Sequence, residues 1–260
     1  MENTLYQLNT IKTIPTNYNY VTGVDNDNIR NLLEFSWSNF FSIYSQLFAE
    51  GNDDRNILIY IENILLMARI CGILKLNTAT EAYINSIINM TNINDNREIG
   101  YKNLQAIQSL VNFIINSGQY IRTGWLVILQ IISKIEYYLN TDKESIRDDL
   151  RKKSNIKNLE KEISINFQKK DIISKNISDV VCDGIFSKTE KFDEESIINF
   201  VQSLCAVSKT ELNEFYHRRD FSFKKLSEVA DFNIYRIQVQ WVKIWKLIGD
   251  HFVYVITHSK

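Results

Sequence analysis

The sequence predicts an all-α fold, a stack of helical hairpins of the HEAT or armadillo-like α-solenoid type. Apolar residues recur three and four positions apart along most of the chain, which is the spacing of one helix face. One Pro and eight Gly among 260 residues leave few breaks. No strand-type alternation separates the apolar segments, and the turns between them are short. Helices joined in this way pack as antiparallel neighbours.

Composition narrows the class of protein. Hydrophobic residues make up 45% of the chain, which excludes a disordered or collagenous protein. The formal net charge of -1 argues against a general polyanion-binding surface, so nucleic acid is not an expected partner. The N-terminus lacks the basic start and apolar run of a signal peptide. The run Trp125 to Ile132 is well short of the roughly 20 residues of a membrane span. We therefore expect a soluble, cytoplasmic chain.

Residues 1–28 are polar and rich in Asn and Thr, and we predict an irregular lead-in. Residues 29–139 form the first predicted helical part. Its five helices run from Ile29 to about Gly51, from Asp53-Asp54 to Gly72, from about Thr78 to the Asn-rich turn Asn92 to Asn96, from about Arg97 to Asn116, and from Trp125 to Leu139. Apolar residues almost encircle the second helix, which should therefore be central.

Residues 140–171 differ in composition, because Lys, Glu, Asp, Arg and Asn dominate. We predict a charged linker or exposed helix that buries little surface. A basic segment of this kind could instead attract an anionic membrane. The lysines and arginines that would do so are Arg151, Lys152, Lys153, Lys157, Lys169 and Lys170.

Residues 172–260 form the second predicted helical part, packed on the first. One helix opens at the acidic residues from Asp193, which suit a helix N-terminus. Further helices cover Phe200 to Leu212 and Phe221 to Asn233. The last begins near Arg236 and places one set of residues on a single face: Ile237, Trp241, Ile244, Trp245, Ile248 and Phe252. We expect both tryptophans to lie in the core, and Gly249 to allow close packing of a neighbouring helix.

Enzyme chemistry is not indicated. None of the common phosphate-binding, nucleophile-elbow or zinc-protease motifs occurs. Cys71, Cys182 and Cys205 lie far apart and are predicted to be reduced core thiols. The histidines His217, His251 and His258 do not pair at metal-ligand spacing. We therefore predict no catalytic residue, no metal and no cofactor.

Two segments carry a family resemblance. Leu204-Cys-Ala-Val-Ser208, followed by Glu211-Leu212, is similar to the segment W-L-C-A-V-S-x-x-E-L, with Ser203 where Trp is common. The C-terminal helix is similar to N-x-x-R-I-x-x-Q-W-x-x-I-W-x-x-I-G-D-H-F. The matching residues are Asn233, Arg236, Ile237, Gln240, Trp241, Ile244, Trp245, Ile248, Gly249, Asp250, His251 and Phe252. Weaker matches are Ala68-Arg69-Ile70, Lys102-Asn103, Ala106-Ile107, Gly118 to Tyr120, Trp125 and Ile135-Glu136.

With these residues the chain resembles the large Golgi and trans-Golgi Arf guanine-nucleotide exchange factors, the BIG/GBF group, over about residues 30–139 and 172–256. It resembles their first homology region downstream of the catalytic exchange domain. The resemblance implies a non-catalytic regulatory module that lacks the exchange domain, with a role in autoinhibition or in GTPase-dependent recruitment to Golgi membranes. The implied partners are an Arf-type small GTPase and neighbouring domains. The alternatives are direct binding of anionic lipid and an unrelated helical-repeat scaffold.

Overall fold

The computed structural model describes residues 25–51, 53–153, 159–214 and 219–258. Within these ranges the chain is helical and contains no strand, as the sequence predicts. The α-helices are α2 Asn26–Glu50, α3 Asp54–Ile73, α4 Asn77–Met90, α5 Tyr101–Ser117, α6 Trp125–Asn140, α7 Lys143–Lys153, α8 Leu159–Asn176, α9 Asp179–Ser187, α10 Glu194–Asn213, α11 Phe221–Asn233 and α12 Gln238–His258. Short 3-10 turns, η1 Gly118–Tyr120, η2 Arg122–Gly124 and η3 Lys188–Lys191, join some of them.

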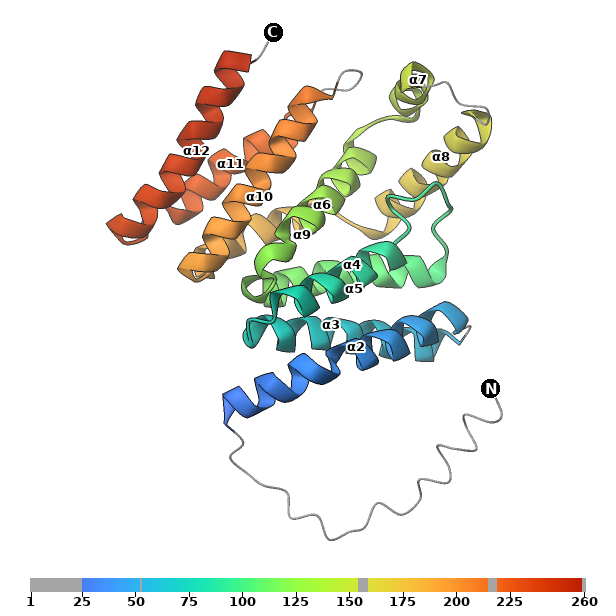
Figure 1. Cartoon of the computed structure of the whole chain (residues 1–260). Helices are drawn as coiled ribbons and strands as arrows, with labels where there is room; N and C mark the ends of the chain where they lie inside the picture. The colour runs from blue at the N-terminus through green and yellow to red at the C-terminus, as the bar shows by residue number, and fades with distance from the viewer. Residues whose placement is uncertain (1–24, 52, 154–158, 215–218, 259–260) are drawn as a thin grey trace.

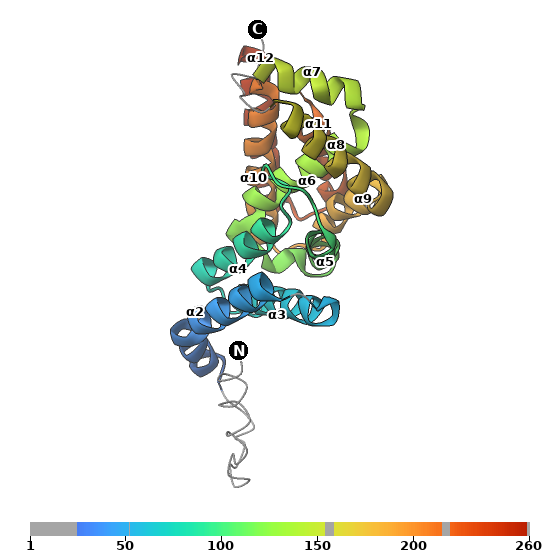
Figure 2. The ribbon, with the colours of Figure 1, turned by 90° about the vertical axis from the view of Figure 1, so that its right-hand side faces the viewer.

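The helices form successive layers. Helix α2 packs on α3, α3 packs on α4 and α5, α6 contacts α8 and α10, and α10 packs against α11 and α12. Helices α2 and α12 therefore lie at opposite ends of the stack (Figure 1, Figure 2). One connected core, which includes Ile61, Trp125 and Phe200, runs between them. This arrangement confirms the predicted helical stack.

Helix α3 passes a simple test for a membrane span, because Arg55–Ile73 has a mean hydropathy of 1.5 over 19 residues. The apolar run at Trp125 singled out from the sequence is thus not the strongest such candidate. In the stack, however, α3 is central, and Ile57, Ile61, Ile64 and Ala68 are buried. We interpret α3 as a core helix.

The start of α10 agrees with the sequence prediction. Asp193 precedes the helix, and its carboxylate accepts a hydrogen bond of 2.7 Å from the backbone N–H of Ser196. This bond satisfies one of the free N–H groups of the first turn. Burial alone would raise the pKa of the Asp193 carboxyl. The hydrogen bonds from Ser196 and the charges of Arg122 and Lys75 outweigh this effect, so the pKa lies below its ordinary value.

The junction between α3 and α6 depends on close backbone contact. A Cβ atom added to Gly72 would lie 2.0 Å from the carbonyl oxygen of Tyr120, so only glycine fits there. Nearby, Arg122 has a φ of 56°, a left-handed value that is uncommon for a residue other than glycine. Its buried side chain donates a 2.6 Å hydrogen bond to Glu195 at the start of α10. These contacts tie the first predicted part to the second.

The segment predicted to be a charged linker, residues 140–171, contains α7 and most of α8. Helix α8 buries Ile163, Ile165 and Ile173 against the stack. Tyr138 of α6 donates a 2.7 Å hydrogen bond to the side-chain oxygen of Asn166. The expectation that this segment buries little surface is therefore wrong for α8, because the helix lies against both α6 and α7 and its apolar residues are buried on more than one side.

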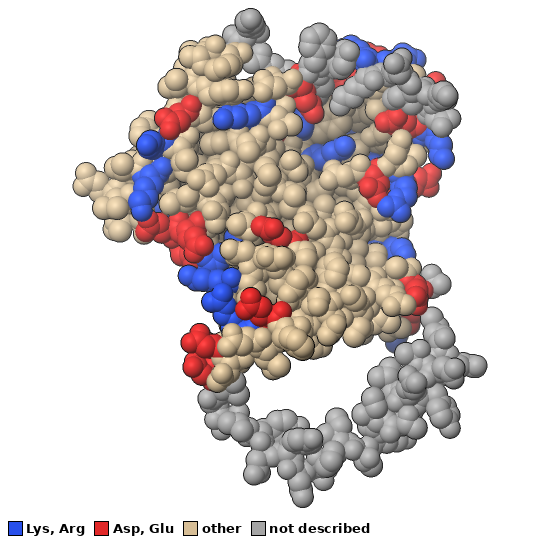
Figure 3. Space-filling model, viewed as in Figure 1, with Lys and Arg blue, Asp and Glu red and all other residues tan. Residues whose placement is uncertain are grey.

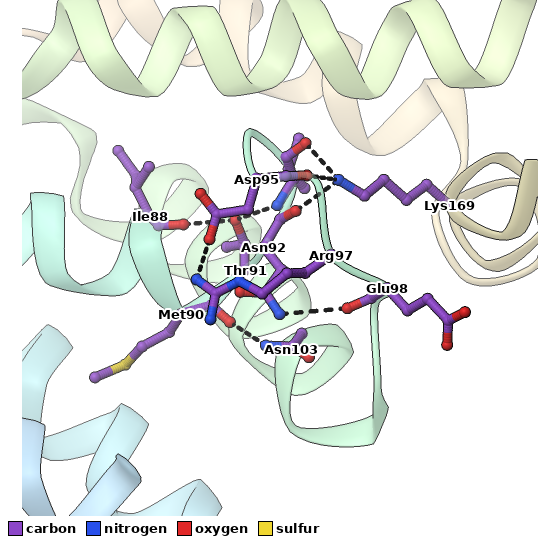
Figure 4. Close-up of polar contacts among 10 residues, drawn as sticks. Ile88, Met90, Thr91, Asn92, Asp95, Arg97, Glu98, Asn103 and Lys169 are labelled. Atoms are coloured by element: carbon purple, nitrogen blue, oxygen red, sulfur yellow. Dashed lines mark hydrogen bonds and ion pairs between the residues drawn. The ribbon is translucent and has the colours of Figure 1, made fainter. Parts of the chain in front are cut away.

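Lys169 on α8 is the clearest departure from the sequence prediction. Only 2% of this residue is exposed. Its ammonium group donates hydrogen bonds to the backbone carbonyl oxygens of Asn92, Ile93 and Asp95 (Figure 4). These carbonyls belong to the loop after α4, so Lys169 ties that loop to α8. Burial lowers the pKa of Lys169 to about 8, mainly by desolvation.

Candidate interaction surface

The residues of the C-terminal pattern separate into three groups in the structure. Leu204, Asn233 and His251 are buried, with exposed fractions of at most 3%. Cys205, Arg236, Gln240, Trp241, Gly249 and Phe252 are partly buried, whereas Trp245 and Asp250 are exposed. Most of the pattern therefore holds α10, α11 and α12 together, and a smaller part faces outward.

Arg236 holds the turn between α11 and α12 against η3 and the residue that follows it. One terminal nitrogen of its guanidinium donates to the carbonyl oxygens of Thr189 at 2.8 Å, Glu190 at 3.1 Å and Phe192 at 2.7 Å. Its Nε donates to the side-chain oxygen of Asn233 at 2.6 Å. The planar, forked guanidinium suits this set of acceptors.

We expect Arg236→Ala to lower the free energy of unfolding by about 2 kcal/mol, because several partly buried carbonyl oxygens lose a charged donor. Lys243→Ala is the matched control. Lys243 forms an ion pair with Glu194 in which both side chains are about half exposed, and its loss should cost at most about 0.5 kcal/mol. Urea unfolding of both variants measures the difference. Equal losses would contradict the role given to Arg236.

His251 is an internal histidine and not a surface ligand. Its Nε2 lies 2.9 Å from the hydroxyl oxygen of Ser208 on α10. The ring also contacts Phe223 and Tyr254, and Nδ1 is buried with no hydrogen-bond partner among the described residues. Burial, with a smaller contribution from the charge of Lys209, lowers the pKa of His251 to about 4. The neutral ring is therefore the form that fits the fold.

This burial predicts a pH effect. Unfolded His251 takes up a proton below its ordinary pKa of 6.5, whereas the folded residue does so only near 4. The unfolded state thus binds more protons in this range, and stability should fall as the pH is lowered through it. His251→Gln should lose less stability between pH 6.5 and pH 4 than the wild type does, as measured by urea unfolding. His258→Gln, at the exposed end of α12, serves as control, and identical profiles for all three proteins would refute the assignment.

The predicted positions of the two tryptophans are only partly correct. Trp241 is partly buried and packs against the core, but Trp245 is 51% exposed. Their rings stack with centroids 5.8 Å apart. Ile237, placed on the same predicted face, is 67% exposed. The buried face of α12 consists of Ile244, Ile248 and His251. The helix is therefore rotated about its axis from the orientation that we expected.

Gly249 also differs from its prediction. A Cβ atom added there would meet nothing within 4 Å, so none of the described helices packs closely on it. It lies instead between exposed apolar residues on the outer side of α12. These exposed residues are Val242, Trp245, Val253 and Ile256. Together with Gly249 we call them the outward stripe. Only Trp245 and Gly249 of this set belong to the pattern identified from the sequence.

The thiols agree with their predicted core positions where they are described. Cys71 is fully buried and Cys205 is partly buried. Burial raises the pKa of Cys71 to about 11 and that of Cys205 to about 12. Both are therefore protonated and poorly nucleophilic near neutral pH. The side chain of Cys182, and His217 as a whole, lie outside the described residues.

A polar cavity of about 240 Å³ lies between the loop after α4 and helices α6, α7 and α8. Its lining includes Lys134, Lys169 and Arg219 as well as Asp149 and Glu162. Asp95 and Glu214 also line it, so both signs of charge are present and the lining does not single out one ligand charge. No group of three or more His, Cys, Asp or Glu side chains among the described residues is arranged to hold a metal ion.

Charged side chains are also mixed on the face shown in Figure 3, where Lys and Arg lie next to Asp and Glu and much of the surface between them is uncharged. Of the basic residues considered for membrane attraction, Lys169 is buried and Lys170 donates a 2.9 Å hydrogen bond to the carbonyl oxygen of Tyr138. Lys157 and the side chain of Lys153 lie outside the described residues. Lys169 and Lys170 are therefore engaged within the fold and do not support the proposed attraction to an anionic membrane.

Comparison with known proteins finds relatives over nearly the whole chain, although no protein-family model matches it. The chain is 26% identical over 253 residues to the human brefeldin A-inhibited guanine nucleotide-exchange protein 1. It is 23% identical over 280 residues to protein 4 of the same name from Arabidopsis thaliana. It is also 23% identical over 269 residues to the ADP-ribosylation factor guanine nucleotide-exchange factor SEC7 of Saccharomyces cerevisiae.

These alignments cover 87%, 91% and 90% of this chain, respectively. They cover only 14%, 16% and 13% of the three relatives. The chain thus corresponds to a small part of each of these long proteins.

Proposed function

Because this chain is a homologue of the large Arf guanine-nucleotide exchange factors, we propose that it acts as a non-catalytic regulatory and scaffold module. In this proposal it corresponds to the first homology region downstream of the exchange domain. It would contact neighbouring domains or an Arf-type GTPase and help to place an exchange factor on Golgi or trans-Golgi membranes from the cytoplasmic side.

The observation that carries this proposal is the C-terminal helical group α10 to α12. It contains the sequence pattern of the resemblance, and most of that pattern forms its internal contacts, such as those of Arg236 and His251. The alignments with the exchange factors extend over about nine tenths of the chain. A helical stack with large exposed side chains at its two ends suits a platform for other domains.

Two measurements with purified Arf test the proposal. The chain alone should not accelerate release of a fluorescent GDP analogue from Arf, because we assign it no exchange activity. In a pull-down, GTP-loaded Arf should bind more than GDP-loaded Arf. Acceleration of release would overturn the non-catalytic assignment. Equal absence of binding to the two forms would remove the GTPase from the proposal and leave contacts with neighbouring domains.

Direct lipid binding is the weaker alternative, since Lys169 and Lys170 are used inside the fold. Flotation with vesicles of neutral phosphatidylcholine, with and without anionic phosphatidylserine, tests it. We expect no dependence on the anionic lipid. Strong dependence would favour the membrane, because each basic residue near an anionic surface contributes about 1 kcal/mol.

A further inference from the structure

A groove between α5 and the end of α8 is lined by uncharged side chains in the described part of the chain. The lining residues are Gln108, Val111 and Asn112 of α5, Asn176 at the end of α8, and Ile177 in the connection to α9. The volume of the groove is about 260 Å³. It lies in the middle of the stack, because α5 contacts α3 and α9, which lie on either side of it (Figure 2).

The apolar residues of the groove are its deeper ones. Val111 is 5% exposed and Ile177 is 8% exposed. The amide side chains reach further out, since Gln108 is partly buried and Asn112 and Asn176 are exposed. Two of the amides belong to α5 and the third to α8. The groove therefore has an apolar floor and primary amides on both of its walls.

The amides of Gln108 and Asn112 make no hydrogen bond to another described residue. Other amides of the same helix are used within the fold, because those of Asn103 and Asn116 donate to the carbonyl oxygens of Met90 and Asn112. Across the groove, the nitrogen of Asn176 donates to the carbonyl oxygen of Ile172 at 2.8 Å, which leaves its oxygen as an acceptor. Both walls thus offer hydrogen-bonding groups to a ligand.

The spacing of the amides matches an extended polypeptide. Gln108 and Asn112 stand four residues apart, which is about 6 Å along a helix axis. In an extended chain, residues two apart are separated by roughly 6.6 Å and direct their N–H and C=O groups to the same edge. A primary amide carries both a donor and an acceptor, so each can pair with the N–H and C=O of one residue.

The depth of the groove fits the same ligand. Successive side chains of an extended chain point to opposite faces, so one set can rest on Val111 and Ile177 while the other set faces solvent. The two hydrogen-bonding edges of the chain then face α5 on one wall and Asn176 on the other. Because the described lining carries no charge, it favours the polar main chain over a phosphate or a charged side chain.

From these features we propose that the groove binds an extended, uncharged segment of a partner polypeptide through its main chain, with Gln108, Asn112 and Asn176 as the recognition residues. The occupant is a loop or linker of the partner and not a folded surface. This inference does not depend on the proposed function, because it rests on the groove alone. A few hydrogen-bonded pairs are a small interface, so we expect a dissociation constant on the order of tens of micromolar.

The test uses the full chain and a set of fluorescein-labelled octapeptides in which Thr alternates with Ala, Val, Leu or Phe. At least one peptide should bind in a fluorescence polarisation titration. Gln108→Ala and Asn112→Ala should each raise its dissociation constant about threefold or more, and a variant that lacks all three amides should raise it about tenfold or more. Gln130→Ala, at an exposed glutamine of α6, is the matched control and should bind as the wild type does.

Methylation of the peptide nitrogens shows whether the main chain is read. Two forms of the best peptide, each N-methylated along one edge only, should both bind at least about tenfold more weakly, because each loses the donors that face one wall. If none of the peptides binds up to about 1 mM, the groove is not a peptide site. The proposal is also wrong if the N-methylated forms bind as tightly as the parent peptide, or if removal of the three amides leaves binding unchanged.

Discussion

Glu211→Ala should lower the free energy of unfolding by about 3 kcal/mol, because it leaves several buried donors without an acceptor. Glu211 is 2% exposed and lies on α10. Its carboxylate accepts hydrogen bonds from the hydroxyl of Ser133 on α6 at 2.5 Å, and from the backbone N–H and the hydroxyl of Ser222 on α11, both at 2.8 Å. One side chain thus joins three helices.

Glu211→Gln is the control for the Glu211 prediction. The amide keeps one oxygen acceptor and nearly the same volume, so it should lose less stability than alanine does, by about 1 kcal/mol or more. Urea unfolding followed by circular dichroism gives both values. If the two variants lose the same small amount, the three hydrogen bonds contribute little and the helices are held by apolar packing alone.

Most helix positions could be predicted from the sequence, because they depend on the local spacing of apolar residues. The 3.6-residue spacing located α3, α4 and α6 to within a few residues, and the acidic start at Asp193 located the beginning of α10. Prediction was poorer for the helix expected from about Arg97, since α5 begins at Tyr101. There a capping arrangement decides the start, in which the backbone N–H of Gly100 donates to the side chain of Asn103.

Contacts between residues far apart in the sequence could not be predicted. Lys169 looks like a solvated charge, and only the fold shows that it reaches carbonyl oxygens more than 70 residues away. A lysine with three backbone acceptors needs a particular loop beside it, and composition carries no such information. The charged character of residues 140–171 therefore hid the packing of α8.

The candidate site was predicted at the level of the helix but not of its faces. The apolar spacing of α12 fits two faces, and both tryptophans were expected on the buried one. The second stripe was present in the spacing of Val242, Trp245, Gly249 and Val253, but which stripe faces α10 depends on the orientation of the whole helix. Burial of His251, a polar residue, shifts that orientation away from the most apolar choice.

Two of the four tryptophans, Trp125 and Trp245, differ sharply in burial. Trp125 is fully buried, and its ring centroid lies 4.6 Å from that of Phe200 and 5.6 Å from that of Phe192. Trp125→Ala should therefore lower the free energy of unfolding by about 3 to 5 kcal/mol, the usual cost of a large cavity. Trp245→Ala, at a half-exposed ring, should cost about 1 kcal/mol or less for the single chain.

Trp125→Phe separates packing from hydrogen bonding at this position. The indole N–H of Trp125 is buried with no hydrogen-bond partner among the described residues, so phenylalanine removes a donor that has no acceptor there. Its loss of stability should be smaller than that of alanine by about 2 kcal/mol or more. Thermal unfolding at a fixed low protein concentration compares the variants without a contribution from association. If Trp245→Ala proved as damaging as Trp125→Ala, the outer face of α12 would be part of the core and could not serve as an interface.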